Sequence, residues 1–300
     1  MNRIVPCLWF DNAAEEAARR YTSIFPNATI GRFMRYSEEG HEIHGRPAGS
    51  VMTVEFQLDG YTVLGLNGGP LFHLTPAISF FAMFETEAGI DAAWAALDDG
   101  GTVLMPLDAY DWSKRYGWLN DRYGVSWQLA LGKRTDIGQA IAPSLLFVGP
   151  QCGRAEEALE HYTAVFPDSR IGGILRHDGT GPDPAGTVMH AQFQLGGETF
   201  MVMDSAHPHD FGFTEATSFI INCDTQDEID HYWHALSTVP EAEQCGWLKD
   251  RFGVSWQIMP RILPELLSDP DPEASARVMR ALLGMKKLDI AALKRAHGGG

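Results

Sequence analysis

Residues 117–129 read GWLNDRYGVSWQL, and residues 246–258 repeat them as GWLKDRFGVSWQI with only three differences. A match of this length within one chain predicts two copies of one domain. In each copy an Asp-Arg-aromatic-Gly turn precedes alternating apolar and polar residues, which predicts a closing strand with one buried face. We therefore expect Ser126 and Gln128 in the first copy, and Ser255 and Gln257 in the second, to lie on the polar faces of these strands.

The predicted elements follow the same order in both copies. Strands over residues 4–10, 30–36, 51–58 and 61–67, with a helix over 13–25, form a βαβββ unit that includes an Asp59-Gly60 turn. A second unit runs from residue 77 to 131, and the order returns from residue 141. About ten extra residues near 106–114 predict a lid or interface loop in the first copy. We expect domains over residues 1–135 and 136–260 and a helical tail over 261–300.

Composition limits the partners that the protein can bind. The formal charge of −16 and the pI near 5.0 argue against nucleic acid and anionic membranes, which are bound through Lys and Arg. Apolar runs are too short to span a membrane, and acidic residues come too early for a signal peptide, so we expect a soluble cytoplasmic protein. The four cysteines show no CxxC spacing and are expected to be free thiols.

The paired βαβββ units, the Phe-Pro after the first helix and the GWLxDRxGVSWQ ending resemble the vicinal oxygen chelate superfamily, which includes glyoxalase I, extradiol dioxygenases and bleomycin-resistance proteins. The nearest branch is the PhnB-like group, labelled 3-demethylubiquinone-9 3-methyltransferase domain proteins. The resemblance implies an α+β fold in which the two units of each domain form a curved mixed sheet around a concave site, with the helices outside. It also implies a homodimer.

The resemblance implies metal ligands as well, but this sequence departs from that pattern. Metal enzymes of the superfamily use His and Glu on the first and last strands, where this chain has Cys7, Ser144, Gln128 and Gln257. Neutral amides and hydroxyls are poor ligands for divalent ions, so we expect no metal. No glycine-rich turn joins a strand to a helix in the way that holds a nucleotide-like cofactor, so we expect no cofactor.

Polar positions on the predicted strands supply the candidate site. His190 and Asp204 on neighbouring strands are predicted as a proton-transfer pair, which Gln257 is expected to join in the second domain. The alternative is a His hydrogen-bonded to a carboxylate for structural reasons. The residues expected to bind a ligand are Trp9, Thr53, Glu55, Asn67, Ser126, Gln128, Gln192, Ser255 and Gln257.

Three functions remain open at this point. The first is binding of a small organic molecule in a concave pocket, with proton transfer by His190. The second is a binding protein that sequesters such a molecule without chemistry. The third is methyl transfer, as the family label suggests. The sequence does not choose the ligand, and fold alone does not determine function.

Overall fold

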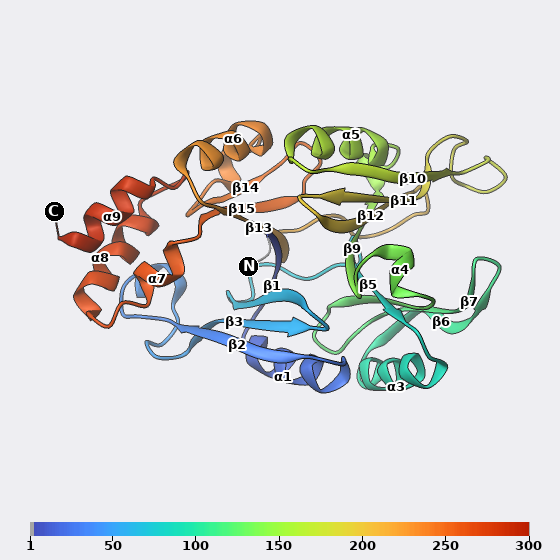
Figure 1. Ribbon diagram of the computed structural model, residues 1–300, viewed down its shortest axis with the longest axis horizontal. Coiled ribbons are helices and arrows are strands. Elements are labelled where there is room, and N and C mark those ends of the chain that lie inside the picture. The colour runs from blue at the N-terminus through green and yellow to red at the C-terminus, as the bar shows by residue number, and fades with distance from the viewer. Residues whose placement is uncertain (1–2, 300) are drawn as a thin grey trace.

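The computed structural model describes residues 3–299 and consists of two curved mixed sheets with helices outside them (Figure 1). Helices α1 and α3 run along one side of the molecule, α5 and α6 run along the opposite side, and the strands lie between them (Figure 1). The α+β class and the outer position of the helices are as expected. Among residues 3–299, none of the helices has the length and apolar character needed to cross a membrane.

The elements appear in the predicted order. The first half contains β1 (Ile4–Phe10), α1 (Ala14–Ile24), β2 (Thr29–Arg35), α2 (His41–His44), β3 (Val51–Leu58), β4 (Tyr61–Asn67), β5 (Ile78–Phe84), α3 (Glu87–Asp98), β6 (Thr102–Tyr110), β7 (Ser113–Asn120) and β8 (Ser126–Leu131). A linker with α4 (Arg134–Ile137) leads to β9 (Ile141–Val148), η1 (Gly149–Gln151), α5 (Ala155–Val165), β10 (Arg170–Arg176), β11 (Val188–Leu195) and β12 (Glu198–Ser205). The last part contains β13 (Thr217–Cys223), α6 (Gln226–Leu236), η2 (Pro240–Ala242), β14 (Trp247–Lys249), β15 (Ser255–Pro260), α7 (Leu263–Leu267), α8 (Pro272–Leu283) and α9 (Ile290–Gly298).

The strands of each sheet come from both halves of the chain, which differs from the pairing within each half that we expected. Sheet A has the order β14-β15-β13-β1-β4-β3-β2, and sheet B has the order β10-β11-β12-β9-β5-β8-β7-β6. At the centre of sheet A, β1 pairs antiparallel with β13, and at the centre of sheet B, β5 pairs with β9. Because β5 and β13 are equivalent strands of the repeat, their patterns do not reveal which of them pairs with β1.

The hydrophobic cores between the sheets and the helices, in contrast, are each built mainly from one half of the chain. Leu8, Phe56 and Trp127 belong to one cluster that packs under α1 and α3. The corresponding cluster of the second half includes Phe193 and Trp256 under α5 and α6. Each core on the helix side is therefore built mainly from one half, with Ile4 and Ile78 of the first half joining the core of the second. The concave faces are shared, and the domain boundaries stay a prediction.

The repeated motif is held together by a buried aspartate. One oxygen of Asp121, Oδ1, accepts the backbone N–H groups of Tyr123 at 2.9 Å and Val125 at 3.0 Å. The other, Oδ2, accepts the Tyr21 hydroxyl at 2.7 Å and the Trp127 Nε1 group at 2.9 Å. The second copy repeats all four bonds with Asp250, Phe252, Val254, Tyr162 and Trp256. The motif is thus a structural unit that ties the closing turn to the first helix of its half.

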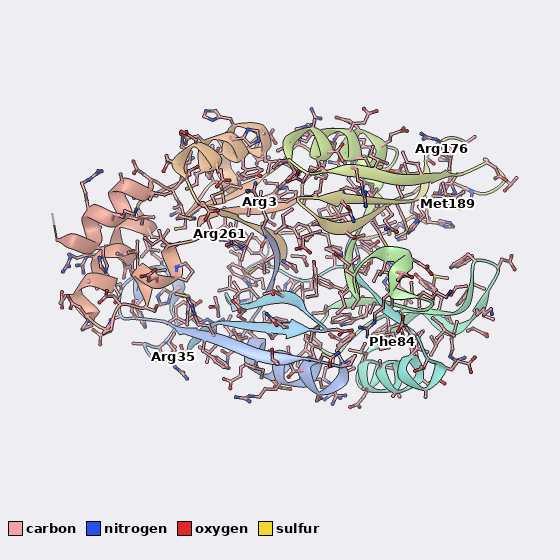
Figure 2. All side chains as sticks on the ribbon, viewed as in Figure 1. Arg3, Arg35, Phe84, Arg176, Met189 and Arg261 are labelled. Carbon is pink, nitrogen blue, oxygen red and sulfur yellow. The ribbon has the colours of Figure 1, made fainter. Side chains whose placement is uncertain are left out.

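The extra residues of the first half form a hairpin instead of the predicted loop, because they lengthen β6 and β7. Its tip carries Trp112, whose side chain is 68% exposed. The second half has a short η2 helix where β6 would stand. Arg35 and Arg176, which end the equivalent strands β2 and β10, lie on opposite sides of the molecule (Figure 2).

The C-terminal tail packs on the second half, as expected, and also reaches the first half. Backbone hydrogen bonds from Cys245 to Met285 at 2.8 Å and from Gly246 to Lys286 at 2.7 Å anchor it beside β14. An ion pair of 2.5 Å joins Arg280 of α8 to Glu39, which precedes α2. The tail therefore extends across one end of the molecule (Figure 1).

Candidate functional site

The concave face of sheet A carries an apolar cavity of about 260 Å³. Its floor includes Val5, Leu64 and Ile220, which come from strands of both halves. Leu267 of α7 and Leu282 of α8 lie on its other side. The tail therefore covers the cavity, and a ligand there would contact both halves of the chain.

The predicted residues Thr53, Glu55 and Gln257 line this cavity. Gln257 donates from Nε2 to the Ser218 hydroxyl at 2.9 Å, and both side chains contact the thiol of Cys7. Burial raises the pKa of Cys7 to about 12, so its thiol is protonated at neutral pH and is a poor nucleophile. The groups beside Gln257 are consequently neutral, and Arg32 and Glu55 are the charged residues of the lining.

The side chains of the protein itself fill the matching region of sheet B. Gln128 donates from Nε2 to Ser79 at 2.8 Å and accepts the Tyr116 hydroxyl on Oε1 at 2.7 Å. Cys245 stands at the position of Tyr116 in the other repeat, so sheet A lacks this ring. In the linker, Ile137 is buried against Ala142 and Met201. These larger or inserted side chains explain why the two faces differ.

The expected pair of His190 and Asp204 does not form, because the two side chains lie on opposite faces of sheet B. Asp204 shares the helix-side face of Val202, and its carboxylate accepts three backbone N–H groups. His190 precedes Ala191, which faces the helix side, so its own side chain points to the concave side. Two of the donors to Asp204, the N–H groups of Gly153 and Ala155, lie at the start of α5. The carboxylate of Asp204 therefore holds the beginning of that helix.

Asn67 has the same structural role in the first half. Its Oδ1 accepts the backbone N–H of Ala14 at 2.9 Å, at the start of α1, and its Nδ2 donates to the carbonyl of Val51 at 3.0 Å. The side chain is 4% exposed and lies on the helix side of β4, away from the cavity. The prediction that Asn67 contacts a ligand in the concave site is therefore wrong. Along β4, Tyr61 and Val63 pack on the helix side, and Asn67 shares their face.

His190 lines an open depression of about 470 Å³ on sheet B, together with Gln192. Asp136 of the linker lines the same depression, a position that no pattern in the sequence indicated. Burial lowers the pKa of His190, which favours a neutral imidazole at pH 7. Gln257 belongs to sheet A, so the predicted convergence of His190 and Gln257 does not occur.

The remaining predicted residues divide between the two sheets. Trp9 donates to a backbone carbonyl at 2.7 Å and packs edge-on against Trp247, 6.0 Å away, beside the sheet A cavity. Ser126 in sheet B accepts the Trp118 Nε1 group at 2.8 Å. Ser255 is buried in sheet A, and its hydroxyl has no hydrogen-bond partner within residues 3–299. The sequence did not predict that Leu267 and Leu282 of the tail line the cavity, because the apolar face of a helix does not indicate which surface it packs on.

The residues at the superfamily's metal positions do not fit a divalent ion. On sheet A the first and last strands offer the protonated thiol of Cys7 and the amide of Gln257, and Ser218 on β13 adds a hydroxyl. Glu55 is the one carboxylate among the described residues that line the cavity. A structural or catalytic zinc site uses thiolate, imidazole or carboxylate ligands. Within the described residues, no group of three or more His, Cys, Asp and Glu side chains is placed to hold a metal.

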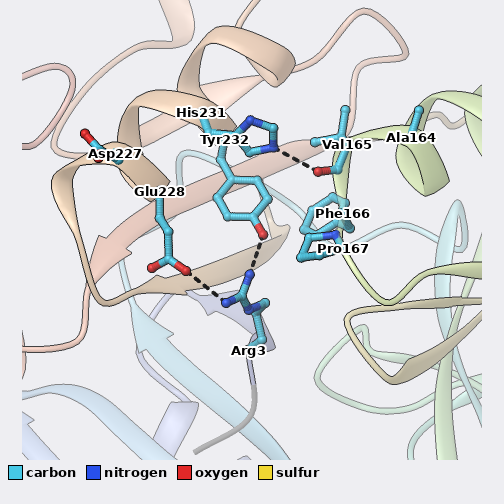
Figure 3. A pocket seen from close by; sticks show the side chains of 9 residues that line it. All are labelled: Arg3, Ala164, Val165, Phe166, Pro167, Asp227, Glu228, His231 and Tyr232. Carbon is cyan, nitrogen blue, oxygen red and sulfur yellow. Dashed lines mark hydrogen bonds and ion pairs between the residues drawn. The ribbon is translucent and has the colours of Figure 1, made fainter.

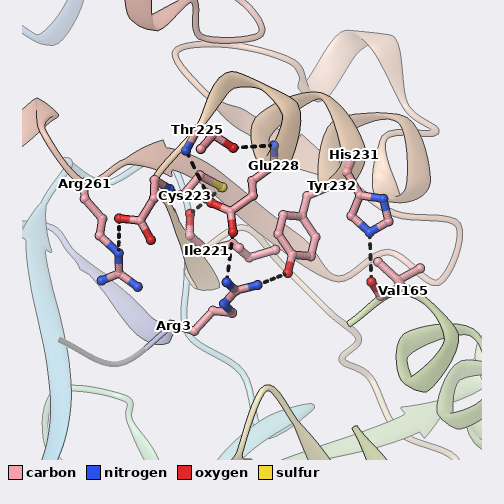
Figure 4. Close-up of polar contacts among 10 residues, drawn as sticks. Arg3, Val165, Ile221, Cys223, Thr225, Glu228, His231, Tyr232 and Arg261 are labelled. Atoms are coloured by element: carbon pink, nitrogen blue, oxygen red, sulfur yellow. Dashed lines mark hydrogen bonds and ion pairs between the residues drawn. The ribbon is translucent and has the colours of Figure 1, made fainter. Parts of the chain in front are cut away.

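A shallow cleft of about 450 Å³ lies outside the sheets, between the end of α5 and α6 (Figure 3). Arg3 in it donates to the Tyr232 hydroxyl at 2.8 Å and pairs with Glu228 at 2.9 Å. Glu228 also completes a capping box with Thr225 at the start of α6, and His231 Nε2 lies 2.9 Å from the Val165 carbonyl oxygen (Figure 4). These contacts give the cluster a structural role in tying the N-terminal segment to α6.

Comparisons with known proteins place this fold. A model of the family described as 3-demethylubiquinone-9 3-methyltransferase matches residues 2–130 and again residues 139–259. A PhnB protein from Bacillus cereus is 39% identical over 43% of this chain and 98% of its own, with a TM-score of 0.39. Glyoxalase I from Zea mays is 8% identical over 84% of this chain and 92% of its own, with a TM-score of 0.53. A search of curated proteins found no match.

The likeness to the maize glyoxalase, at this low identity, shows the fold alone. The family model, in contrast, covers most of the chain and matches it twice, once in each half. The resemblance inferred from the repeated motif is thus confirmed. The chain belongs to the 3-demethylubiquinone-9 3-methyltransferase family and carries two tandem copies of its domain.

Proposed function

We propose that the protein binds one small, largely apolar organic molecule in the sheet A cavity. The observation that carries this proposal is the cavity itself, which has an apolar wall, a few polar groups and a cover of α7 and α8. Small-molecule sites are typically concave and apolar, with a small number of polar groups that orient the ligand. The neutral amide of Gln257 is the polar group best placed for that role.

The size of the cavity favours sequestration of a single molecule over methyl transfer. Sites for drug-sized ligands have volumes of roughly 300–1,000 Å³. The cavity, at about 260 Å³, lies just below that range, which favours one small ligand over a methyl donor together with its acceptor. The reaction in the family's name therefore finds less support here than binding does.

Proton transfer by His190 is a second candidate, supported by a different observation. The lowered pKa of His190 favours the neutral, proton-accepting form, and the side chain lines an open depression with Gln192. Asp136 is the carboxylate on the same depression, so it would take the orienting role that we first assigned to Asp204. Such chemistry would occur on sheet B and would be separate from binding on sheet A.

Filling the cavity should weaken binding without disturbing the fold. Ile220→Phe introduces the ring that Phe81 supplies at the matching position of sheet B, where each residue pairs with the closing glutamine of its sheet. We expect the affinity for N-phenyl-1-naphthylamine, an uncharged fluorescent probe, to fall by about five- to 140-fold, because overlap in a packed site costs about 1–3 kcal/mol. Fluorescence titration measures this change.

Ile171→Phe is the matched control, because Ile171 lies on β10 of sheet B and is 40% exposed. We expect this variant to bind the probe as the parent protein does. An Ile220→Phe protein that keeps its circular dichroism spectrum and the parent affinity would contradict the proposal.

A further inference from the structure

The two sheets place the same glutamine in different surroundings. In sheet B, the phenol group of Tyr116 donates its hydroxyl to Oε1 of Gln128 at 2.7 Å, while Nε2 donates to Ser79. In sheet A, Gln257 repeats the Nε2 bond with Ser218 at 2.9 Å. The carbonyl oxygen of Gln128 therefore accepts a phenol hydroxyl, whereas that of Gln257 accepts no phenol hydroxyl from the described residues.

The strand register shows that Tyr116 in sheet B and Cys245 in sheet A occupy corresponding positions. Trp118 pairs with Gln128 across β7 and β8, and Trp247 pairs with Gln257 across β14 and β15. Tyr116 and Cys245 each lie two residues before these tryptophans. The chain therefore supplies no ring from position 245, and both Cys245 and Gln257 line the cavity instead.

We propose that the cavity takes an aromatic molecule that carries a hydroxyl group, and that this hydroxyl donates to Oε1 of Gln257 as Tyr116 does to Gln128. This inference rests on the proposed binding function and specifies its ligand class. A carbonyl oxygen that a ligand covers gains from a donor on that ligand, since an acceptor covered without one loses its hydration without compensation. Ile220 and Met259, which also line the cavity, would contact the ring, and a thioether packs well against aromatic rings.

Matched ligands test this inference on the intact protein. 2-Naphthol, naphthalene and 2-methoxynaphthalene share one ring system, but only the first can donate a hydrogen bond. We expect 2-naphthol to bind more tightly than the other two by about three- to tenfold, the range that one net hydrogen bond provides. Isothermal titration calorimetry measures the three dissociation constants.

Gln257→Leu should remove the preference for 2-naphthol, because leucine lacks the acceptor Oε1 as well as the Nε2 group that donates to Ser218. Gln57→Leu makes the same change at an exposed position of β3 in the same sheet and should retain the preference. The comparison among ligands on the parent protein does not depend on whether Gln257→Leu folds.

The outcomes separate this inference from the proposed function. Equal affinity of the parent protein for all three ligands would overturn the inference and leave apolar binding intact. A preference that persists in folded Gln257→Leu would also overturn it. Failure of all three ligands to bind would overturn both proposals.

Discussion

Asp250→Ala is expected to lower the free energy of unfolding by about 3–5 kcal/mol, the range seen when one partner of a buried charged network is removed. Asp250 is 1% exposed and accepts four hydrogen bonds, among them those from Tyr162 at 2.6 Å and Trp256 at 2.8 Å. Alanine would leave all four donors buried without an acceptor and would open a space between α5 and β15. Urea unfolding followed by circular dichroism measures the change.

Asp210→Ala is the matched control, because Asp210 is exposed in the loop after β12 and accepts none of the hydrogen bonds of the described chain. We expect that variant to change stability by less than about 0.5 kcal/mol, as exposed substitutions usually do. A loss below about 1 kcal/mol for Asp250→Ala would show that the buried network does not hold the repeated motif together.

The two halves of the chain, produced separately as residues 1–138 and 139–300, are expected not to fold as monomers. Separation removes the β1–β13 and β5–β9 pairs at the centres of both sheets. Ile4 and Ile78, which pack into the core of the second half, would lose that core. Exposed strand edges of this kind lead to unfolding or to association. Circular dichroism and analytical ultracentrifugation distinguish these outcomes.

Each half retains two βαβ-type units, so a second copy of the same half can supply the missing strand pairs. We therefore expect any folded half to be a homodimer, and a folded monomeric half would contradict the shared sheets. The homodimer of the intact chain, which the family resemblance implies, stays a separate prediction.

Much of the fold could be predicted because the alternation of residues determines which face of a strand is buried. Along β3, Val54 and Phe56 pack on the helices, while Thr53 and Glu55 line the cavity, as their alternation indicated. The Asp59-Gly60 turn is confirmed by its positive φ values of 52° and 84°. These features depend only on neighbours along the chain.

Most of the errors concern relations between distant segments, and one concerns the faces of neighbouring strands. The pairing of β1 with β13 could not be predicted, because equivalent strands of a repeat have equivalent patterns. The pairing of His190 with Asp204 overlooked the side-chain alternation on β11 and β12, which puts the two residues on opposite faces. The role of α7 and α8 as a cover depends on where the tail returns, which Leu267 and Leu282 do not encode locally.

We infer that strands from both halves build one ligand site on sheet A. A crystal structure of the protein with N-phenyl-1-naphthylamine bound tests it most directly. We expect the probe between Leu64 of the first half and Gln257 of the second, beneath Leu282 of the tail. A probe bound instead on sheet B, beside His190 and Gln192, would contradict the account.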